Sequence, residues 1–262
     1  QRQMCIRDRY MSEIVINAQN LSKNFYNFDS RLPFIKRFLK RNQITIRAVQ
    51  DISFTIKRGS IVGFIGSNGA GKSTTIKMLT GTLYPSSGKL EVNGEIPFKR
   101  SINFRKKISI VVGNKLQLFQ DVSAMDYFQL IGTLYEVEPA ILQERIQELS
   151  NLLNVKDQLY QQVRTLSLGQ KMKMEFIAAS LTSPEILFLD EPTIGLDIQS
   201  KKDIRTFLKK MNEECHTTII LTSHDMDDIS SVCDELIVID KGKIILQESM
   251  AVSYTHLTLP TN

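Results

Sequence analysis

Gly66-Ser67-Asn68-Gly69-Ala70-Gly71-Lys72-Ser73 is the stretch that decides the fold of this chain. It fits the pattern G-x-x-x-x-G-K-[ST] at every fixed position. A short apolar run, Ser60 to Ile65, precedes it and predicts a buried strand, and Ser73 to Leu83 predicts a helix after it. A glycine turn without special function does not account for this setting, so the stretch predicts a phosphate-binding loop.

The residue types of the loop suit phosphate chemistry. Glycine has no Cβ, so backbone N–H groups can turn inward on an anion, and the following helix adds its positive N-terminal end. We expect Lys72 to reach the β- and γ-phosphates of a nucleotide and the Ser73 hydroxyl to bind Mg²⁺. Thr74, one residue into the helix, is expected to donate to an α-phosphate.

A second half of the site is predicted at Ile186 to Glu191, where a buried apolar strand ends in two carboxylates. A carboxylate at the C-terminal edge of a parallel strand points into the ligand crevice. We expect Asp190 to hold Mg²⁺ and Glu191 to orient or deprotonate the attacking water. The alternative is a strand that stops at a solvated acidic turn, which would leave Lys72 without a partner site.

Strand patterns alternate with helical patterns along most of the chain. Ile14 to Ala18 and Ile52 to Ile56 alternate apolar and polar residues, which is typical of half-buried strands. Between about Gly113 and Thr165 strand signals are absent and two helical stretches follow each other. The sequence therefore predicts an α/β core around a mostly parallel sheet, with a helical subdomain inserted into it.

The two ends of the chain read as an artefact of sequencing adapters. A DNA string that encodes residues 1–9 encodes, in inverted form, residues 251–259. We therefore expect residues 1–10 and 251–262 to be foreign and residues 11–250 to form the domain. Without the three arginines and one aspartate of these ends, 30 basic and 27 acidic residues remain, so the charge falls from +5 to +3. Charge alone does not support a nucleic-acid partner.

Three further motifs resemble the ATP-binding subunit of an ABC transporter. Leu166-Ser167-Leu168-Gly169-Gln170 is similar to the family signature Leu-Ser-Gly-Gly-Gln, with Leu168 in place of the first glycine. Ile194-Gly195-Leu196-Asp197 resembles the family D-loop, and Thr222-Ser223-His224 resembles the switch-histidine segment. The resemblance implies a P-loop NTPase (RecA-like) core with an N-terminal antiparallel β subdomain and the inserted helical subdomain.

The resemblance also implies how such a protein works. Two subunits would face each other head to tail, and each ATP would be held by the phosphate loop of one and the signature of the other. Ser167, Gly169 and Gln170 would then serve the partner's nucleotide, and Asp197 would lie at the dimer seam. His224 would contact the γ-phosphate and position the water together with Glu191.

Two site residues remain open within the resemblance. The family places a glutamine that binds Mg²⁺ at the junction into the helical subdomain; here Asn114 aligns with it, and Gln117 is the alternative. The family stacks adenine on an aromatic residue after the first strand; Phe25 sits at that place, and Tyr26 is the alternative.

The segment Asn27 to Ile46 is an insertion relative to most members of the family. Its part Arg31 to Arg41 carries apolar residues at helical spacing among basic ones. Such a stretch either lies on an anionic membrane or a partner, or is a solvated insertion. It favours the subfamily that is paired with type-two export permeases for drugs, polysaccharides or lipids.

The expected function is therefore that of an ATPase that uses ATP and Mg²⁺ to power a separate membrane permease. The expected partners are that permease and a second ATPase subunit, identical or related. No apolar run reaches the ~18 residues of a membrane span, so we expect the cytoplasmic face of the membrane, reached through the permease. The alternatives are a soluble ABC-type ATPase with a non-transport partner and an import ATPase.

Overall fold

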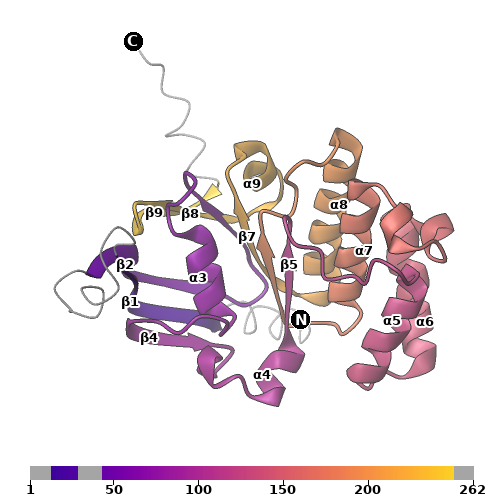
Figure 1. Ribbon diagram of the computed structural model, residues 1–262, viewed down its shortest axis with the longest axis horizontal. Coiled ribbons are helices and arrows are strands. Elements are labelled where there is room, and N and C mark those ends of the chain that lie inside the picture. The colour runs from indigo at the N-terminus through magenta and orange to yellow at the C-terminus, as the bar shows by residue number, and fades with distance from the viewer. Residues whose placement is uncertain (1–12, 29–42, 251–262) are drawn as a thin grey trace, which may run out of the picture.

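The computed structural model describes residues 13–28 and 43–250. The two ends predicted to be foreign and the basic stretch Arg31 to Arg41 lie outside these residues. The described part consists of two sheets, with helices packed around the larger one (Figure 1).

The larger sheet has the strand order β5-β6-β7-β3-β8-β9. The first five of these strands are parallel, and β9 runs antiparallel to β8. This confirms the predicted parallel core, although β9 was not predicted, because it is an exposed edge strand without a buried apolar run. The bounds are β3 Ile61–Ile65, β5 Ile108–Val112, β6 Ile186–Asp190, β7 Thr218–Ser223, β8 Glu235–Asp240 and β9 Lys243–Ser249.

The smaller sheet is antiparallel, in the order β2-β1-β4, as the resemblance implies. Its strands are β1 Ile14–Phe28, β2 Gln43–Lys57 and β4 Ser87–Val92. The first two are much longer than predicted and pair up to Phe28 and Gln43. The segment predicted to be an insertion, Asn27 to Ile46, therefore includes the end of β1 and the start of β2. That it is an insertion relative to most of the family stays a prediction.

The helices bring the loops of the site into place. The helix after the phosphate loop, α3 Lys72–Leu79, ends earlier than predicted, because Gly81 adopts a left-handed φ of 70°. The others are α4 Ile102–Lys107, which was not predicted, α5 Ala124–Leu134, α6 Pro139–Leu152, α7 Leu168–Ser180, α8 Ile198–Cys215 and α9 Met226–Val232, with 3₁₀ turns η2 Pro97–Lys99, η3 Lys156–Gln158 and η4 Val163–Thr165.

Both faces of the larger sheet are covered. Alternate strand residues point to opposite faces, so Phe188 and Ile220 join a core with α3 and the smaller sheet, whereas Leu187 and Ile219 join a core with the helices α5 to α8. In Figure 1, α5 and α6 lie at the end of the molecule away from the smaller sheet. Among the helices within the described ranges, none combines the length and the apolar composition that crossing a membrane requires.

Candidate functional site

The phosphate loop connects the C-terminal end of β3 to α3. Two of its three glycines are needed for packing, since a Cβ on Gly66 would lie 2.2 Å from the carbonyl oxygen of Ile239, and one on Gly71 would lie 2.6 Å from that of Ala48. Lys72 is only 5% exposed, and its side chain folds back over the loop. Its Nζ donates to the carbonyl oxygens of Gly66 at 2.7 Å and Ser67 at 3.3 Å, which places a positive charge where the loop would receive phosphate.

The predicted Mg²⁺ residues meet beside the loop. The Ser73 hydroxyl donates to Oδ1 of Asp190 at 2.9 Å, and the Thr222 hydroxyl donates to the same oxygen at 2.7 Å. Asp190 and Thr222 are paired residues at the ends of β6 and β7. The carboxyl ends of β6 and β7 and the first turn of α3 therefore meet at one carboxylate, as expected at the C-terminal edge of a parallel sheet.

Glu191 lies between the phosphate-loop lysine and the switch histidine. One carboxylate oxygen, Oε1, is 3.4 Å from Lys72 Nζ, and the other, Oε2, is 2.6 Å from His224 Nδ1. An ionised carboxylate can only accept, so the second contact requires a proton on Nδ1. Three residues that are far apart in sequence thus form one line of polar contacts at the edge of the sheet.

The backbone of Glu191 is held in an unusual conformation. Its φ is 52°, in the left-handed region that costs most residues ~1–2 kcal/mol. Its N–H contacts both the carbonyl oxygen of Thr222 at 3.1 Å and the Thr222 hydroxyl at 3.0 Å. Gly113 makes room, because a Cβ there would lie 1.9 Å from the carbonyl oxygen of Glu191. The sequence did not predict these roles of Gly113 and Thr222, although Thr222 directly precedes Ser223-His224 in the switch-histidine segment.

The oxygen atoms around Asp190 fit Mg²⁺. This ion prefers oxygen ligands and is commonly held by one or two carboxylates, with water and substrate phosphate completing its shell. A hydroxyl and a carboxylate 2.9 Å apart supply such a partial shell. Over residues 13–28 and 43–250, there is no cluster of three or more His, Cys, Asp or Glu side chains that would form a complete protein cage for a metal.

Asn114 and Gln117 lie in the loop that follows β5. The N–H of Gly113 donates to the backbone carbonyl of Asp190 at 2.9 Å, so Asn114 comes directly after a residue bound to the Mg²⁺ side of the site. The Asn114 side chain is exposed. The amide of Gln117 instead donates to the carbonyl oxygen of Ile110 at 2.9 Å. This arrangement favours Asn114, whose role stays a prediction.

The signature residues form a second group at the start of α7. Ser167 is the N-cap: its Oγ accepts from the N–H of Gln170 at 3.2 Å, and the Gln170 side chain accepts from the N–H of Ser167 at 2.9 Å. A Cβ on Gly169 would lie 2.3 Å from Ser200 Oγ and 3.0 Å from Asp197 Oδ2. The signature therefore packs directly against the first turn of α8.

Asp197 is the N-cap of α8. Its two carboxylate oxygens accept from the Ser200 hydroxyl at 2.7 Å and the Ser200 N–H at 2.8 Å, and these bonds lower the pKa of Asp197. The hydrogen bonds of Ser167, Gln170 and Asp197 stay within α7 and α8. The structure thus brings the signature and D-loop residues together with each other, while the phosphate loop is assembled with Asp190, Glu191 and His224.

Phe25 lies on the hairpin that passes beside the phosphate loop. It pairs with Ile46, is 40% exposed, and its ring centroid is 5.4 Å from Lys23 Nζ. The strand β2 approaches the loop at Ala48 and Val49, next to Gly71. Tyr26 is also exposed but points to the opposite side of the strand. The choice of Phe25 as the residue that stacks on adenine stays a prediction.

Comparison with known proteins identifies the family of the chain. Residues 49–194 match the family described as "ABC transporter". The chain is 32% identical over 219 residues to the ABC transporter ATP-binding protein NatA of Bacillus subtilis, covering 84% of this chain and 88% of NatA. It is 34% identical to the linearmycin resistance ATP-binding protein LnrL of the same organism, covering 75% of this chain and 63% of LnrL.

Solved structures share the fold. CbiO1 of Clostridium perfringens, which is part of the ABC transporter complex CbiONQ, superimposes with a TM-score of 0.76 at 26% identity, covering 94% of this chain and 92% of CbiO1. The ATP-binding cassette MJ0796 superimposes with a TM-score of 0.74 at 20% identity, covering 90% and 98% of the two chains. The matched family segment and the similarity to NatA show that the chain belongs to the ABC transporter family as an ATP-binding ATPase subunit.

Proposed function

We propose that this ATP-binding subunit hydrolyses ATP as one half of a head-to-tail dimer and thereby drives an export permease from the cytoplasmic face of the membrane. The observation that carries the proposal is the position of Glu191. Its carboxylate lies between Lys72 and His224, next to the hydroxyl and carboxylate of Ser73 and Asp190. A base, a cation and a histidine are thus held around the place where the terminal phosphate of ATP would lie.

Each residue of the loop has a role in this proposal. The backbone N–H groups of Gly66 to Ser73 bind the phosphates, and Lys72 leaves its carbonyl contacts to reach the β- and γ-phosphates. Thr74 donates to the α-phosphate, and Phe25 stacks on the adenine. Mg²⁺, held by Ser73, Asp190 and Asn114, would neutralise phosphate charge.

The hydrolytic step uses Glu191 and His224. Glu191 takes a proton from water as the water oxygen forms a bond to the γ-phosphorus, and the bond to the bridging oxygen of ADP breaks. His224 contacts the γ-phosphate and keeps the water in line with Glu191. The negative charge of Glu191 is compensated by Lys72 before the reaction, because their side chains are only 3.4 Å apart.

The second subunit is proposed from the group around Ser167 and Asp197. The helix dipole gives the N-terminal end of α7 a partial positive charge. Ser167, Gly169 and Gln170 lie at this end, which would face the nucleotide of the partner subunit. Three large apolar side chains are exposed around the same turns, and Ile198 is 88% exposed. Apolar side chains gathered in one place favour a protein contact; the exposed ones here are Leu168, Ile194 and Ile198.

The direction of transport is proposed from the similarity to LnrL and from the segment between β1 and β2. LnrL is named for resistance to linearmycin, and the segment between β1 and β2 is longer than in most of the family. The ATPase partner is a second copy of this chain or a related subunit. A neighbouring reading frame with about six membrane spans of ~20 residues each would support the permease assignment.

The test is the substitution Glu191→Gln, which keeps the size of the side chain but removes the base. We expect kcat for ATP hydrolysis to fall by about 10²–10⁴-fold with ATP binding retained. The purified variant should elute as a dimer on size exclusion with Mg²⁺ and ATP, and as a monomer with ADP.

Glu185→Gln is the matched control, because Glu185 directly precedes the opposite end of the same strand. It is expected to hydrolyse ATP at the rate of the unaltered protein at neutral pH. Normal turnover of Glu191→Gln would contradict the role of Glu191 as base, and absence of an ATP-dependent dimer would contradict the head-to-tail arrangement.

A further inference from the structure

The helix that follows the switch histidine contains a buried acid. Asp228 on α9 is only 2% exposed, whereas its neighbour Asp227 is exposed. A buried carboxylate is costly unless it is paired and hydrogen-bonded. Asp228 contributes nothing to the contacts of Lys72, Asp190 and Glu191 described above, so its burial requires a separate explanation.

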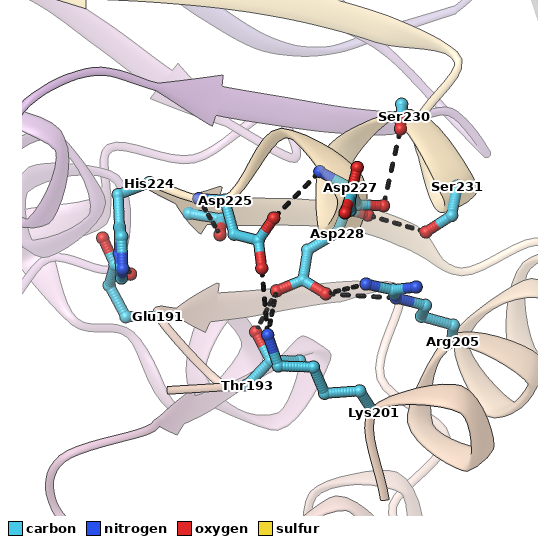
Figure 2. A network of polar contacts seen from close by, with 11 residues as sticks. Glu191, Thr193, Lys201, Arg205, His224, Asp225, Asp227, Asp228, Ser230 and Ser231 are labelled. Carbon is cyan, nitrogen blue, oxygen red and sulfur yellow. Dashed lines mark hydrogen bonds and ion pairs between the residues drawn. The ribbon is translucent and has the colours of Figure 1, made fainter. Parts of the chain in front are cut away.

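The partners of Asp228 come from two other elements (Figure 2). The Thr193 hydroxyl donates to Oδ2 at 2.6 Å. Arg205 of α8 donates from Nε to Oδ1 at 3.1 Å, and its Nη2 contacts the same oxygen. Lys201, one helical turn earlier on α8, has its Nζ 3.7 Å from Oδ2. Both carboxylate oxygens are therefore bound, and two cations compensate the charge.

These partners lie on two segments that carry residues of the proposed ATP site: the turn after Glu191 and the helix α8. Thr193 is two residues after Glu191, in the turn that begins with the left-handed Glu191 backbone. Arg205 and Lys201 belong to the helix whose N-cap is Asp197, the residue proposed for the dimer seam. Asp228 itself follows His224 by four residues. One carboxylate thus joins the Glu191 turn, the Asp197 helix and the His224 segment.

A second link runs parallel to the first. Lys201 donates to Oδ2 of Asp225 at 2.9 Å, and Asp225 is the N-cap of α9 directly after His224. The hydrogen bond stabilises the charged form of both groups: it lowers the pKa of Asp225 and raises the pKa of Lys201. The beginning and the first turn of α9 are therefore both fastened to α8.

We propose that Asp228 is a positioning residue that holds His224 against Glu191 and makes that position depend on the helix α8. This inference rests on the proposed function, because it assigns Asp228 a part in hydrolysis. A shift of the Asp197 end of α8 on contact with a second subunit would move Arg205 and Lys201, and through Asp228 it would move the His224 segment. The side-chain partners of Asp228 are Thr193, Arg205 and Lys201 rather than residues of the phosphate loop, so it acts through His224.

The test compares Asp228→Asn with Asp227→Asn in the full chain. The first removes the charge that binds Arg205 but keeps the size of the side chain and an oxygen for Thr193. We expect kcat for ATP to fall by about 10-fold or more, since misplacement of a catalytic group by 1 Å can cost about 10²-fold. KM for ATP should stay within about threefold, because the phosphate loop is unchanged. Asp227→Asn makes the same chemical change on the exposed neighbour and should leave kcat unchanged.

The decisive measurement is the effect of Asp228→Asn on kcat in a His224→Ala background. If Asp228 acts through His224, adding Asp228→Asn lowers the residual kcat by less than about twofold, because residues that act as a unit are not additive. A folded Asp228→Asn variant with normal kcat overturns the proposal. An equal loss with and without His224 overturns it too, because the effect would then be structural.

Arg205→Met provides a second route if Asp228→Asn fails to fold. It removes the cation of the Arg205–Asp228 pair, whose arginine is the partly exposed member. It should also lower kcat, and its effect should likewise be much smaller in the His224→Ala background. A folded Arg205→Met variant with normal kcat overturns the proposal by this route. The unaltered protein and Glu191→Gln separate this result from the proposed function: if these two behave as expected and the Asp228 and Arg205 variants do not, only the positioning role is wrong.

Discussion

At the scale of single residues, the site depends on a close approach between two backbones. Glu191 has a φ of 52°, and its carbonyl group lies against Gly113 at the end of the neighbouring strand. The two hydrogen bonds from its N–H to Thr222 hold this conformation. The direction of the Glu191 side chain toward Lys72 and His224 is therefore fixed by its backbone setting.

We predict that Gly113→Ala lowers both stability and activity. The added Cβ would lie 1.9 Å from the carbonyl oxygen of Glu191, so the turn must move. Overpacking of this kind costs ~1–3 kcal/mol, and displacement of the base should lower kcat by about 10²-fold. Denaturant unfolding and steady-state ATP hydrolysis measure the two effects.

Gly94→Ala is the control for this prediction. A Cβ on Gly94 meets nothing within 4 Å, but its φ is 73°, so alanine is strained by ~1–2 kcal/mol there. This variant should lose stability and keep kcat. If Gly113→Ala also keeps kcat while losing stability, the close approach serves folding only.

At the scale of elements, α7 connects the signature to the rest of the site. Glu175 on this helix is buried, and its Oε1 accepts from the N–H of Leu118 at 2.8 Å and from the N–H of Gln117. Burial raises the pKa of Glu175, and these two N–H groups partly offset the effect. On its other side, Lys173 donates to Asp203 of α8 at 2.6 Å. The helix that begins with Ser167 is thus tied to the loop of Asn114 and to the helix of Asp197.

We predict that Glu175→Ala destabilises the helical part of the molecule. It leaves two N–H groups without their acceptor, at a cost of ~1–3 kcal/mol each. For a chain of this size, Tm should fall by roughly 5–15 °C. Glu175→Gln keeps an acceptor oxygen and avoids burying a charge, so it should lose less than half as much. Equal losses for the two variants, measured by thermal unfolding, would show that the acceptor is not what holds the loop.

At the scale of the whole molecule, Arg58 joins the two sheets. It lies between β2 and β3 and donates to Glu185 at 2.7 Å, to Asn93 at 2.8 Å and to Glu13 at 3.1 Å. Burial alone would raise the pKa of Glu185, but the bonds from Arg58 and from Lys107 outweigh it and lower this pKa. The smaller sheet, β3 and the start of β6 are therefore held together by one guanidinium group and its acidic partners.

We predict that this contact contributes to acid lability. A carboxyl with a lowered pKa in the folded state stabilises the fold above its unfolded pKa, near 4.5, and this contribution is lost as the pH falls through the folded value. The difference in unfolding free energy between the unaltered protein and Glu185→Gln should therefore be full at pH 7 and shrink below about pH 4.5. The comparison removes the opposing effect of Glu175, which is the same in both proteins. A difference that does not change with pH would contradict the assignment.

The sequence by itself determined the features that depend on neighbouring residues. The phosphate loop, the apolar run that ends in Asp190-Glu191 and the alternation of strands and helices were all predicted, because a turn, a buried strand and an amphipathic helix each have a local pattern. The N-cap at Ser167 is likewise local, since Ser167 and Gln170 bind each other across one turn. The strands β1 and β2 were predicted too short and α3 too long, because sheet pairing and the left-handed Gly81 override local periodicity.

Only the tertiary structure decided which of these features meet. Glu191 and His224 are 33 positions apart, and their contact depends on the parallel register of β6 with β7, which no local pattern encodes. Thr222 meets Asp190 through the same register, and Gly113 meets Glu191 through the parallel register of β5 with β6. The contacts of Asp228 on α9 with Arg205 on α8 follow from helix packing. The physical reason is that hydrophobic periodicity specifies which face of an element is buried, whereas side-chain packing between elements selects the partner.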